Sequence, residues 1–201
     1  MLKQKKNKLI IGITGCIGSG KSTVARMFKA KDCQLIDADK LAHRLLATGS
    51  FVYKKIVANF GKSILRRNNS IDRAKLAKIA FVDKKALAKL NRIVHQAVIA
   101  EIKRRIKNSD KKIVILDAAL IIETGLRKMF DKLVVVTARR EQQILRSQKR
   151  LALSRAEIVR RMKYQISQNE KLRLADFIID NSGALSKTRK QIIEIRRTLI
   201  R

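Results

Sequence analysis

The chain has 201 residues, 46% of them hydrophobic, which is enough to bury a core as one domain or as one domain with an inserted lobe. Its 48 Lys and Arg against 16 Asp and Glu give a formal charge of +32, so the surface will attract polyanions. Two cysteines are too few for a disulfide framework and indicate a reducing compartment, and no apolar run approaches the roughly 20 residues of a membrane span. We therefore expect a cytoplasmic globular protein.

Short β-branched runs alternate along the chain with segments of helical periodicity, which is typical of a parallel sheet with crossover helices. The basic start runs into Leu9–Thr14, which we interpret as a first strand and not as part of a signal peptide. The predicted strands are Leu9–Thr14, Gln34–Asp37, Lys112–Leu116, Leu133–Thr137 and Phe177–Ile179. The predicted helices are Lys21–Lys29, Glu141–Arg150, Arg155–Gln168 and Ser186–Leu199, with Ser154 and Ser186 as N-caps.

The stretch from Phe51 to Asn108 has no convincing strand but keeps helical spacing of its apolar residues. The sequence therefore predicts a core formed by residues 1–50 and 111–201, with residues 51–110 inserted as a helical lobe.

The segment Gly15–Ser22 fits G-x-x-x-x-G-K-[ST] in full and lies after an apolar strand and before a helix. Glycines let such a loop turn tightly and bring backbone N–H groups around phosphate oxygens, and the following helix adds its N-terminal positive end. Lys21 would reach the β- and γ-phosphates, and the Ser22 hydroxyl would ligate Mg²⁺. Cys16 is interpreted as a small filler residue. The predicted nucleotide-binding residues of the loop are Gly15, Gly18, Ser19, Gly20, Lys21, Ser22 and Thr23.

Two further acidic positions follow predicted strands. Asp117 closes an apolar run and is predicted to hold Mg²⁺ or a metal-bound water, the alternative being an acid that merely ends a strand. Asp37 and Asp39 follow the second strand, where one of them could take the proton of a substrate hydroxyl. From spacing alone, an N-cap for the helix at Lys40 explains this pair equally well.

The arginine-rich segment Arg139–Arg161 also has two interpretations. It could be a solvated basic face, or it could supply mobile arginines that close over the phosphates. Arg146 and Arg150 lie four residues apart on one predicted helix, so both could face the same phosphates.

Beyond the loop, the chain resembles the dephospho-coenzyme A kinase family from about Leu9 to Gln191. The loop reads TGCIGSGKSTVA, and it is followed at family spacing by IDADKLAH (Ile36–His43) and LNRIVH (Leu90–His95). The later elements are LDAALIIETGL (Leu116–Leu126), EQQILRSQKR (Glu141–Arg150), MKYQ (Met162–Gln165) and ADFIIDNSG (Ala175–Gly183). The IDADKLAH and ADFIIDNSG elements make the resemblance far more specific than the loop alone.

The resemblance implies an α/β fold of the P-loop NTPase type: a parallel five-stranded sheet with flanking helices, an inserted helical substrate lobe and a helical lid within about residues 139–173. It also implies ATP- and Mg²⁺-dependent phosphorylation of the ribose 3′-hydroxyl of dephospho-coenzyme A. By family position, Asp39 is the candidate base, and Arg146 and Arg150 belong to the lid. Asn181 and Gly183 would lie near the adenine, and His95 is a candidate acceptor contact, although His95 and His43 could equally be structural.

The chain departs from the family by losing prolines, of which it has none. Gln96 follows the histidine of LNRIVH and Ala119 stands in the segment after Asp117, where the family commonly has proline. Another proline is replaced near Arg139. Proline pre-sets φ, so these losses bear on local loop geometry and not on the phosphate chemistry.

Two alternatives stay open at the level of sequence. One keeps the fold and changes the acceptor to another small molecule or nucleotide. The other is a basic nucleic-acid-binding protein, which the charge favours but the 4% aromatic content does not. We expect a monomer with no membrane partner, and non-specific polyanion binding at low salt.

Overall fold

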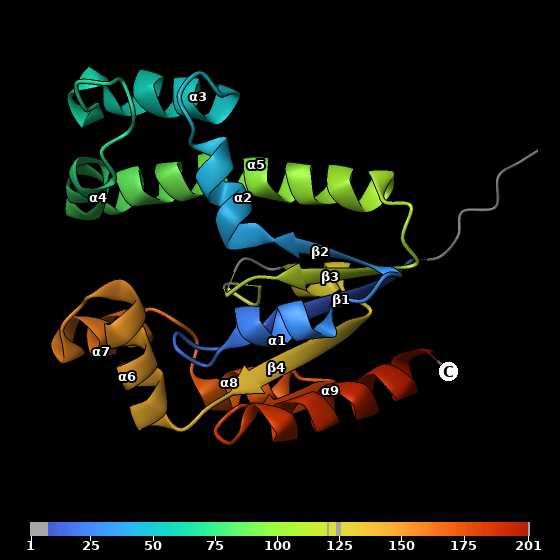
Figure 1. Cartoon of the computed structure of the whole chain (residues 1–201). Helices are drawn as coiled ribbons and strands as arrows, with labels where there is room; N and C mark the ends of the chain where they lie inside the picture. Colours follow the sequence, from blue (N-terminus) through green and yellow to red (C-terminus); the bar gives the residue numbers. More distant parts are fainter. Residues whose placement is uncertain (1–7, 120, 124–125, 201) are drawn as a thin grey trace, which may run out of the picture. The chain divides into compact units, whose positions relative to one another are not determined.

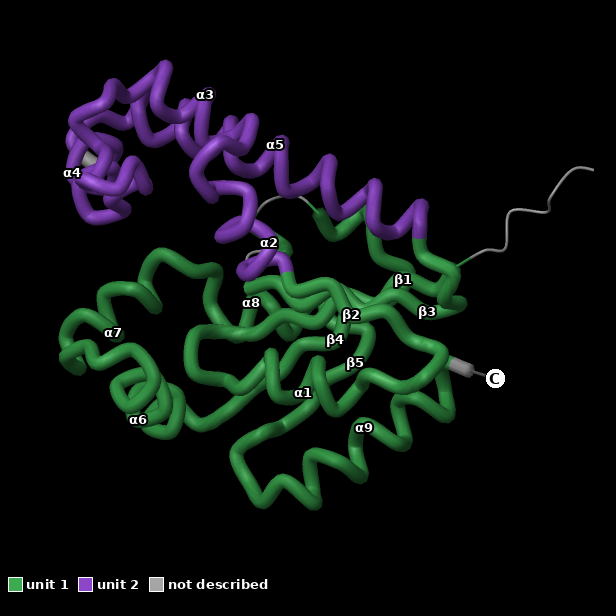
Figure 2. The backbone as a smooth tube through the Cα atoms, turned by 45° about the horizontal axis from the view of Figure 1, so that its top comes forward, with its two compact units in different colours: residues 1–37, 109–201 green, residues 38–108 purple. Residues whose placement is uncertain are grey.

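The computed structural model describes residues 8–119, 121–123 and 126–200. The chain forms two compact units, coloured separately in Figure 2. Met1–Asp37 together with Ser109–Arg201 form the first, which we call the sheet unit, and Ala38–Asn108 form the second, which we call the helical unit.

The sheet unit contains five parallel strands in the order β2-β3-β1-β4-β5, of which β2, β3, β1 and β4 are labelled in Figure 1. The strands are β1 (Leu9–Thr14), β2 (Cys33–Asp37), β3 (Ile113–Asp117), β4 (Lys132–Thr137) and β5 (Phe177–Asp180). Every predicted strand is confirmed, with its ends within one residue. Because β1 is central, its register sets Ile13 beside Asp117, so the loop after β1 emerges next to the end of β3. In an open parallel sheet, this edge is where ligands bind.

Helices flank the sheet, and α1 and α9 pack against each other. Alternate residues of the central strands, including Ile11 and Ile13 of β1, form a buried core with Phe28 of α1 and Ile192 of α9. This alternation follows from the two-residue period of a strand. The helical elements of the unit are α1 (Lys21–Phe28), η2 (Leu126–Met129), α6 (Arg140–Leu151), α7 (Arg155–Lys163), α8 (Gln168–Arg173) and α9 (Leu185–Ile200).

Two sequence predictions about these helices are wrong. Arg155–Gln168 is not one helix, because Ser167 and Glu170 form a capping box that starts α8 as a separate helix. Ser186 is not an N-cap, since α9 begins one residue earlier and the Ala184 carbonyl accepts the first backbone N–H groups. The Ser154 cap is confirmed, and Glu157 completes a capping box there.

The helical unit has its own small core, formed by Val52, Ile56, Ile64, Ile71 and Leu76. It begins earlier than the predicted lobe because α2 packs against α5 and α3 and so belongs with them. Its elements are α2 (Ala38–Leu45), α3 (Phe51–Phe60), η1 (Lys62–Ile64), α4 (Arg73–Val82) and α5 (Lys84–Asn108).

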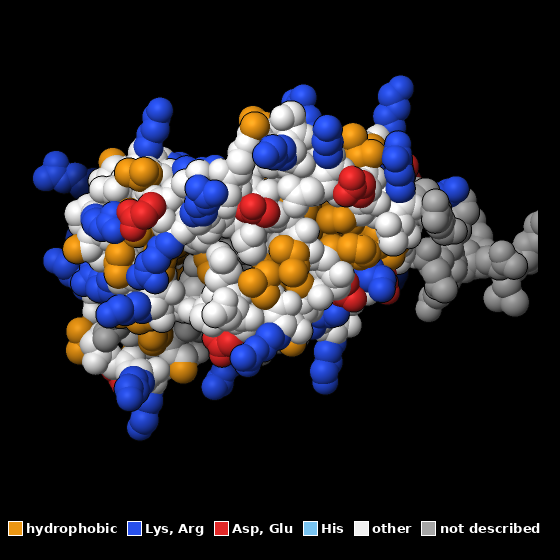
Figure 3. All heavy atoms as spheres, turned by 90° about the horizontal axis from the view of Figure 1, so that it is seen from below, with side chains coloured by type: hydrophobic (Ala, Val, Ile, Leu, Met, Phe, Trp, Pro, Cys, Tyr) orange, Lys and Arg blue, Asp and Glu red, His pale blue; other side chains and the backbone are white. Residues whose placement is uncertain are grey.

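Lys and Arg side chains are spread over the face shown in Figure 3, with few acidic side chains among them. On that face the positive charge is therefore distributed and does not form one patch. Within the described residues, no helix combines the length and the apolar character that a membrane crossing requires.

Candidate active site

The loop between β1 and α1 has the backbone geometry of a phosphate cradle. Gly18 and Gly20 adopt φ of 78° and 88°, a conformation that L side chains rarely adopt. A Cβ on Gly15 would lie 2.4 Å from the Val136 carbonyl oxygen, so this glycine is required by close packing instead. The loop closes on itself through a 3.0 Å hydrogen bond from the Ser19 N–H to the Cys16 carbonyl. The three predicted loop glycines are thus needed for its shape.

Lys21, the first residue of α1, points to the end of β3. Its Nζ lies 2.8 Å from Asp117 Oδ1 and 3.4 Å from Ser22 Oγ. Asp117 is only 2% exposed, so the ammonium offsets the cost of burying that carboxylate. The structure therefore brings three predicted site residues together around one cationic atom.

Ser22 and Asp117 also form a donor set that suits Mg²⁺. A hydroxyl and a carboxylate beside the same ammonium are oxygen ligands placed where a cation is already accommodated, and Mg²⁺ prefers such ligands. Among the described residues there is no group of three or more His, Cys, Asp or Glu side chains that could hold a metal. A Mg²⁺ ion bound with a nucleotide needs no such group, because phosphates and waters complete its coordination.

Helix α6 supports the loop from one side. A Cβ on Gly18 would lie 2.1 Å from the Gln143 carbonyl oxygen and 2.6 Å from Ser147 Oγ, so backbone and helix touch there. Arg146, on the same helix, donates from one guanidinium nitrogen to the Asn181 carbonyl at 3.0 Å. Its other terminal nitrogen, Nη1, is buried near Gly20 with no hydrogen-bond partner among the described residues. A buried cationic donor beside a phosphate loop is arranged to receive a phosphate oxygen.

Asn181, just after β5, braces the same loop. Its Nδ2 donates to the Ser19 carbonyl at 2.8 Å, and its Oδ1 accepts from the Thr188 hydroxyl at 3.0 Å. The residue is 4% exposed, so its side chain is committed to the protein interior. Gly183 is exposed. Contact of either residue with the adenine stays a prediction.

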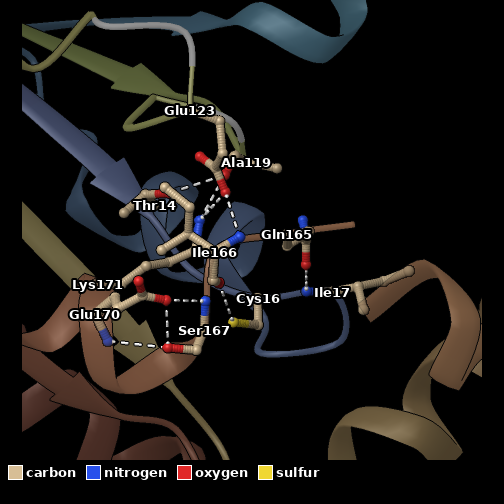
Figure 4. Close-up of polar contacts among 10 residues, drawn as sticks. All are labelled: Thr14, Cys16, Ile17, Ala119, Glu123, Gln165, Ile166, Ser167, Glu170 and Lys171. Atoms are coloured by element: carbon tan, nitrogen blue, oxygen red, sulfur yellow. Dashed lines mark hydrogen bonds and ion pairs between the residues drawn. The ribbon is translucent and has the colours of Figure 1, made fainter. Parts of the chain in front are cut away.

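The segment between α7 and α8 supports the loop from another direction (Figure 4). Ile17 donates its backbone N–H to Gln165 Oε1 at 2.9 Å, and Cys16 Sγ lies 4.0 Å from the Ile166 carbonyl oxygen. The Ile166 N–H donates to Glu123 Oε1 at 3.2 Å. The loop is thus held by hydrogen bonds to the segment between α7 and α8. Burial raises the pKa of the Cys16 thiol, in keeping with a packing role.

A fully buried lysine holds this segment in place. Lys171 is 0% exposed, and its Nζ donates to Glu123 Oε1 at 2.7 Å and to the Ala119 carbonyl at 3.1 Å (Figure 4). The Thr14 hydroxyl, at the end of β1, donates to the same carbonyl at 3.1 Å. The Lys171 ammonium therefore links α8 to the stretch that follows β3, and the Ala119 carbonyl joins the same ammonium to the end of β1. Ala119 takes part through its backbone alone, so the loss of proline at this position leaves the contact intact.

The remaining predicted site residues lie elsewhere. Arg150 is exposed in the last turn of α6, one turn beyond Arg146. Asp39 is exposed in the first turn of α2, and His95 lies on α5, both in the helical unit. Partial burial lowers the pKa of His95 below its ordinary value.

Sequence reasoning missed the residues that support the loop: Gln143, Ser147, Gln165, Glu123 and Lys171. Only the S-x-x-E pattern at Ser167 could have indicated a helix start beside Lys171. Nothing in the sequence distinguishes the buried Lys171 from the other basic residues of this chain.

Comparison with known proteins matches most of the chain to one family. The family model for dephospho-CoA kinase matches residues 9–187. A dephospho-CoA kinase from Aquifex aeolicus (strain VF5) is 44% identical over 192 residues, which cover 95% of this chain and 97% of the relative. The solved dephospho-CoA kinase from Campylobacter jejuni is 27% identical, has a TM-score of 0.68, and the match covers 94% of this chain and 96% of that one. The crystal structure of TT1252 from Thermus thermophilus is 28% identical, has a TM-score of 0.85, and the match covers 97% and 99%.

Proposed function

The chain belongs to the dephospho-CoA kinase family, and we propose that it transfers the γ-phosphoryl group of ATP to the ribose 3′-hydroxyl of dephospho-coenzyme A, the last step of coenzyme A biosynthesis. In this reaction the 3′-oxygen forms a bond to the γ-phosphorus, the bond from that phosphorus to the bridging oxygen breaks, and ADP leaves.

One observation carries the proposal: the glycine cradle holds Lys21 and Ser22 beside the buried Asp117. Phosphoryl transfer depends on positioning and on stabilising charge on the phosphate oxygens, and little covalent chemistry is left to the protein. Backbone N–H groups of the cradle would bind the phosphates, and Lys21 would exchange part of its contact with Asp117 for the γ-phosphate. Arg146 Nη1 would add a second cationic donor, because it is buried near the loop with no hydrogen-bond partner in the described part of the chain.

Ser22 and Asp117 are the residues that would hold Mg²⁺, directly or through a water. When bound, the ion neutralises charge on the β- and γ-phosphate oxygens. Asp39 would orient the 3′-hydroxyl and accept its proton, and Arg150 would approach the phosphates from the last turn of α6. Gly183, Asn181 and His95 keep their predicted roles near adenine and acceptor as part of this proposal.

A coupled assay for ADP release by the full chain, with ATP and Mg²⁺, tests the function. We expect ADP release that depends on dephospho-coenzyme A and a product carrying a new 3′-phosphate, identified by mass and by phosphorus NMR. A nucleoside monophosphate and shikimate, which carries an unrelated hydroxyl, serve as control acceptors. Faster turnover with either control than with dephospho-coenzyme A would contradict the proposed acceptor.

A further inference from the structure

The helical unit contains a pocket of about 510 Å³ whose walls come from two separate stretches of chain. The end of α2 and the residues after it form one wall, and the turn before α4 forms the other. Three basic side chains line it, namely His43, Arg66 and Arg73, together with the apolar Leu46 and Ile71. The described lining residues include no acidic side chain, so the pocket offers positive charge beside an apolar surface.

Hydrogen bonds fix the backbone of the turn that carries Arg66. Leu65 and Ile71 form an antiparallel bridge, and the Arg66 N–H donates to the Ser70 carbonyl at 2.9 Å across the turn between them. Asn69 takes the left-handed conformation with φ of 59°, and its carbonyl accepts from the Tyr53 hydroxyl at 2.7 Å. This turn fixes where the Arg66 side chain leaves the backbone.

The position of Arg73 is set by the N-cap of α4. Asp72 caps α4 by accepting from the Ala74 and Lys75 N–H groups, so Arg73 stands at the first position of the helix. Its Nη1 lies 3.0 Å from His43 Nε2. A guanidinium can only donate, so His43 Nε2 accepts this hydrogen bond and orients the Arg73 fork without adding a competing negative charge. Arg66 is only loosely compensated, since its Nε lies 3.7 Å from Asp72 Oδ2 and its side chain is 60% exposed.

The pocket is related to Asp39 through α2. Asp39 and His43 are four residues apart on that helix, so they lie on one face and are separated by a rise of about 6 Å. In dephospho-coenzyme A, the 3′-hydroxyl and the 5′-diphosphate flank a single ribose, a separation comparable to one helical turn. An acceptor whose hydroxyl meets Asp39 would therefore bring its diphosphate to the level of His43 and Arg73.

We propose that this pocket binds the 5′-diphosphate of the acceptor, with Arg66 and Arg73 as its ligands, His43 orienting Arg73, and the apolar wall contacting the uncharged arm beyond the diphosphate. The inference rests on the proposed function for the identity of the acceptor. Planar guanidinium groups suit this role because each can donate two hydrogen bonds to phosphate oxygens.

The test is the binding of 4′-phosphopantetheine to the full chain by calorimetry at about physiological ionic strength, because this probe carries the arm and a phosphate but no adenosine. We expect Arg66→Gln and Arg73→Gln each to weaken binding by about tenfold or more, since each loses a charge-assisted contact. Arg67→Gln is the matched control: Arg67 is exposed, adjacent to Arg66 and not part of the described lining, so its loss should change binding less than about twofold. The KM for dephospho-coenzyme A should rise in the same two variants, while the KM for ATP stays unchanged.

Equal weakening in all three variants would overturn the proposal, because it would assign binding to the overall charge of +32. Unchanged binding in Arg66→Gln and Arg73→Gln would also overturn it. Circular dichroism checks that each variant is folded. If Arg73→Gln unfolds, Arg73→Lys replaces it, with weakened binding still expected.

The same measurements separate failure of the pocket from failure of the proposed function. If Arg66→Gln and Arg73→Gln weaken binding and Arg67→Gln does not, but the wild type releases no ADP with dephospho-coenzyme A, the proposed function fails and the pocket stands. If the wild type is active with dephospho-coenzyme A but the variants do not show this difference in binding, only the proposed diphosphate pocket fails.

Discussion

The sheet unit and the helical unit present their chemical groups in opposite ways. In the sheet unit, Lys171 is 0% exposed and Asp117 is 2% exposed, and each is paired with an opposite charge. In the helical unit, Asp39, His43 and Arg73 are exposed on their helices. Removing one partner of a buried pair leaves a buried charge, whereas removing an exposed charge costs little. Changes at the buried charges beside the phosphate loop should therefore affect both stability and turnover, and changes at these exposed residues of the helical unit should affect turnover or binding alone.

Lys21→Met should have the largest effect. We expect kcat/KM to fall by about 10²-fold or more, because a phosphate contact is lost, and the free energy of unfolding to fall by about 3 kcal/mol, because Asp117 stays buried without its partner. Steady-state kinetics and urea titration measure the two losses. The double variant Lys21→Met with Asp117→Asn should recover stability but not activity. Unchanged stability in the single variant would contradict the importance of the pair.

Lys171→Met should remove the ion pair that joins Glu123 to α8. We expect a loss of about 3–5 kcal/mol in the free energy of unfolding, measured by urea titration, because Glu123 keeps its charge without its partner. Lys163→Met is the control, since Lys163 is an exposed lysine of the preceding helix and should change stability by less than about 0.5 kcal/mol. Adding Glu123→Gln to Lys171→Met should restore part of the loss. Equal effects of the two lysine variants would show that burial of Lys171 does not matter.

Asp39→Asn should reduce turnover and leave stability unchanged. We expect kcat to fall by about 10²-fold, as the proposed proton acceptor is lost, with the midpoint of urea unfolding unchanged because the side chain is exposed. Asp37→Asn is the control from the same acidic pair, and it should keep most of the activity. Full turnover in Asp39→Asn, with loss in Asp37→Asn, would move the role of the base to the other acid.

Glu101→Gln should give the smallest effect. Hydrogen bonds from Arg104 and Arg105 lower the pKa of Glu101 from its ordinary 4.5 to about 2. A lowered pKa means that the carboxylate stabilises the fold above pH 4.5, and that this contribution is lost as the pH falls toward 2. Because the arginines are partly exposed, at 60% and 32%, we expect less than about 1 kcal/mol at pH 7. The difference in unfolding free energy between wild type and variant, followed from pH 7 to pH 3, should shrink; a constant difference would contradict the assignment.

The two units also differ in how far they could be predicted. The strands of the sheet unit were predicted within one residue, because each is a largely apolar run bounded by turns. The loop motif predicted Lys21 and Ser22 as site residues, and the apolar run that Asp117 closes predicted that acid. The limits of the helical unit were less predictable, because α2 is assigned by its packing against α5 and not by any local pattern. The break between α7 and α8 was missed since apolar spacing continues across it and only the capping box at Ser167 interrupts the helix.

By itself, the sequence determined the parallel sheet, the phosphate loop and the residues predicted to contact a nucleotide, because these depend on short-range periodicity and on backbone conformations that only glycine adopts readily. The tertiary structure alone decided that Lys171 is buried among the basic residues that the structure describes, that Asn181 braces Ser19, and that Arg73 meets His43 across 30 positions of chain. The physical reason is that burial and pairing belong to groups that are distant in sequence, and the free energy of a charge depends on the neighbours that the fold gives it.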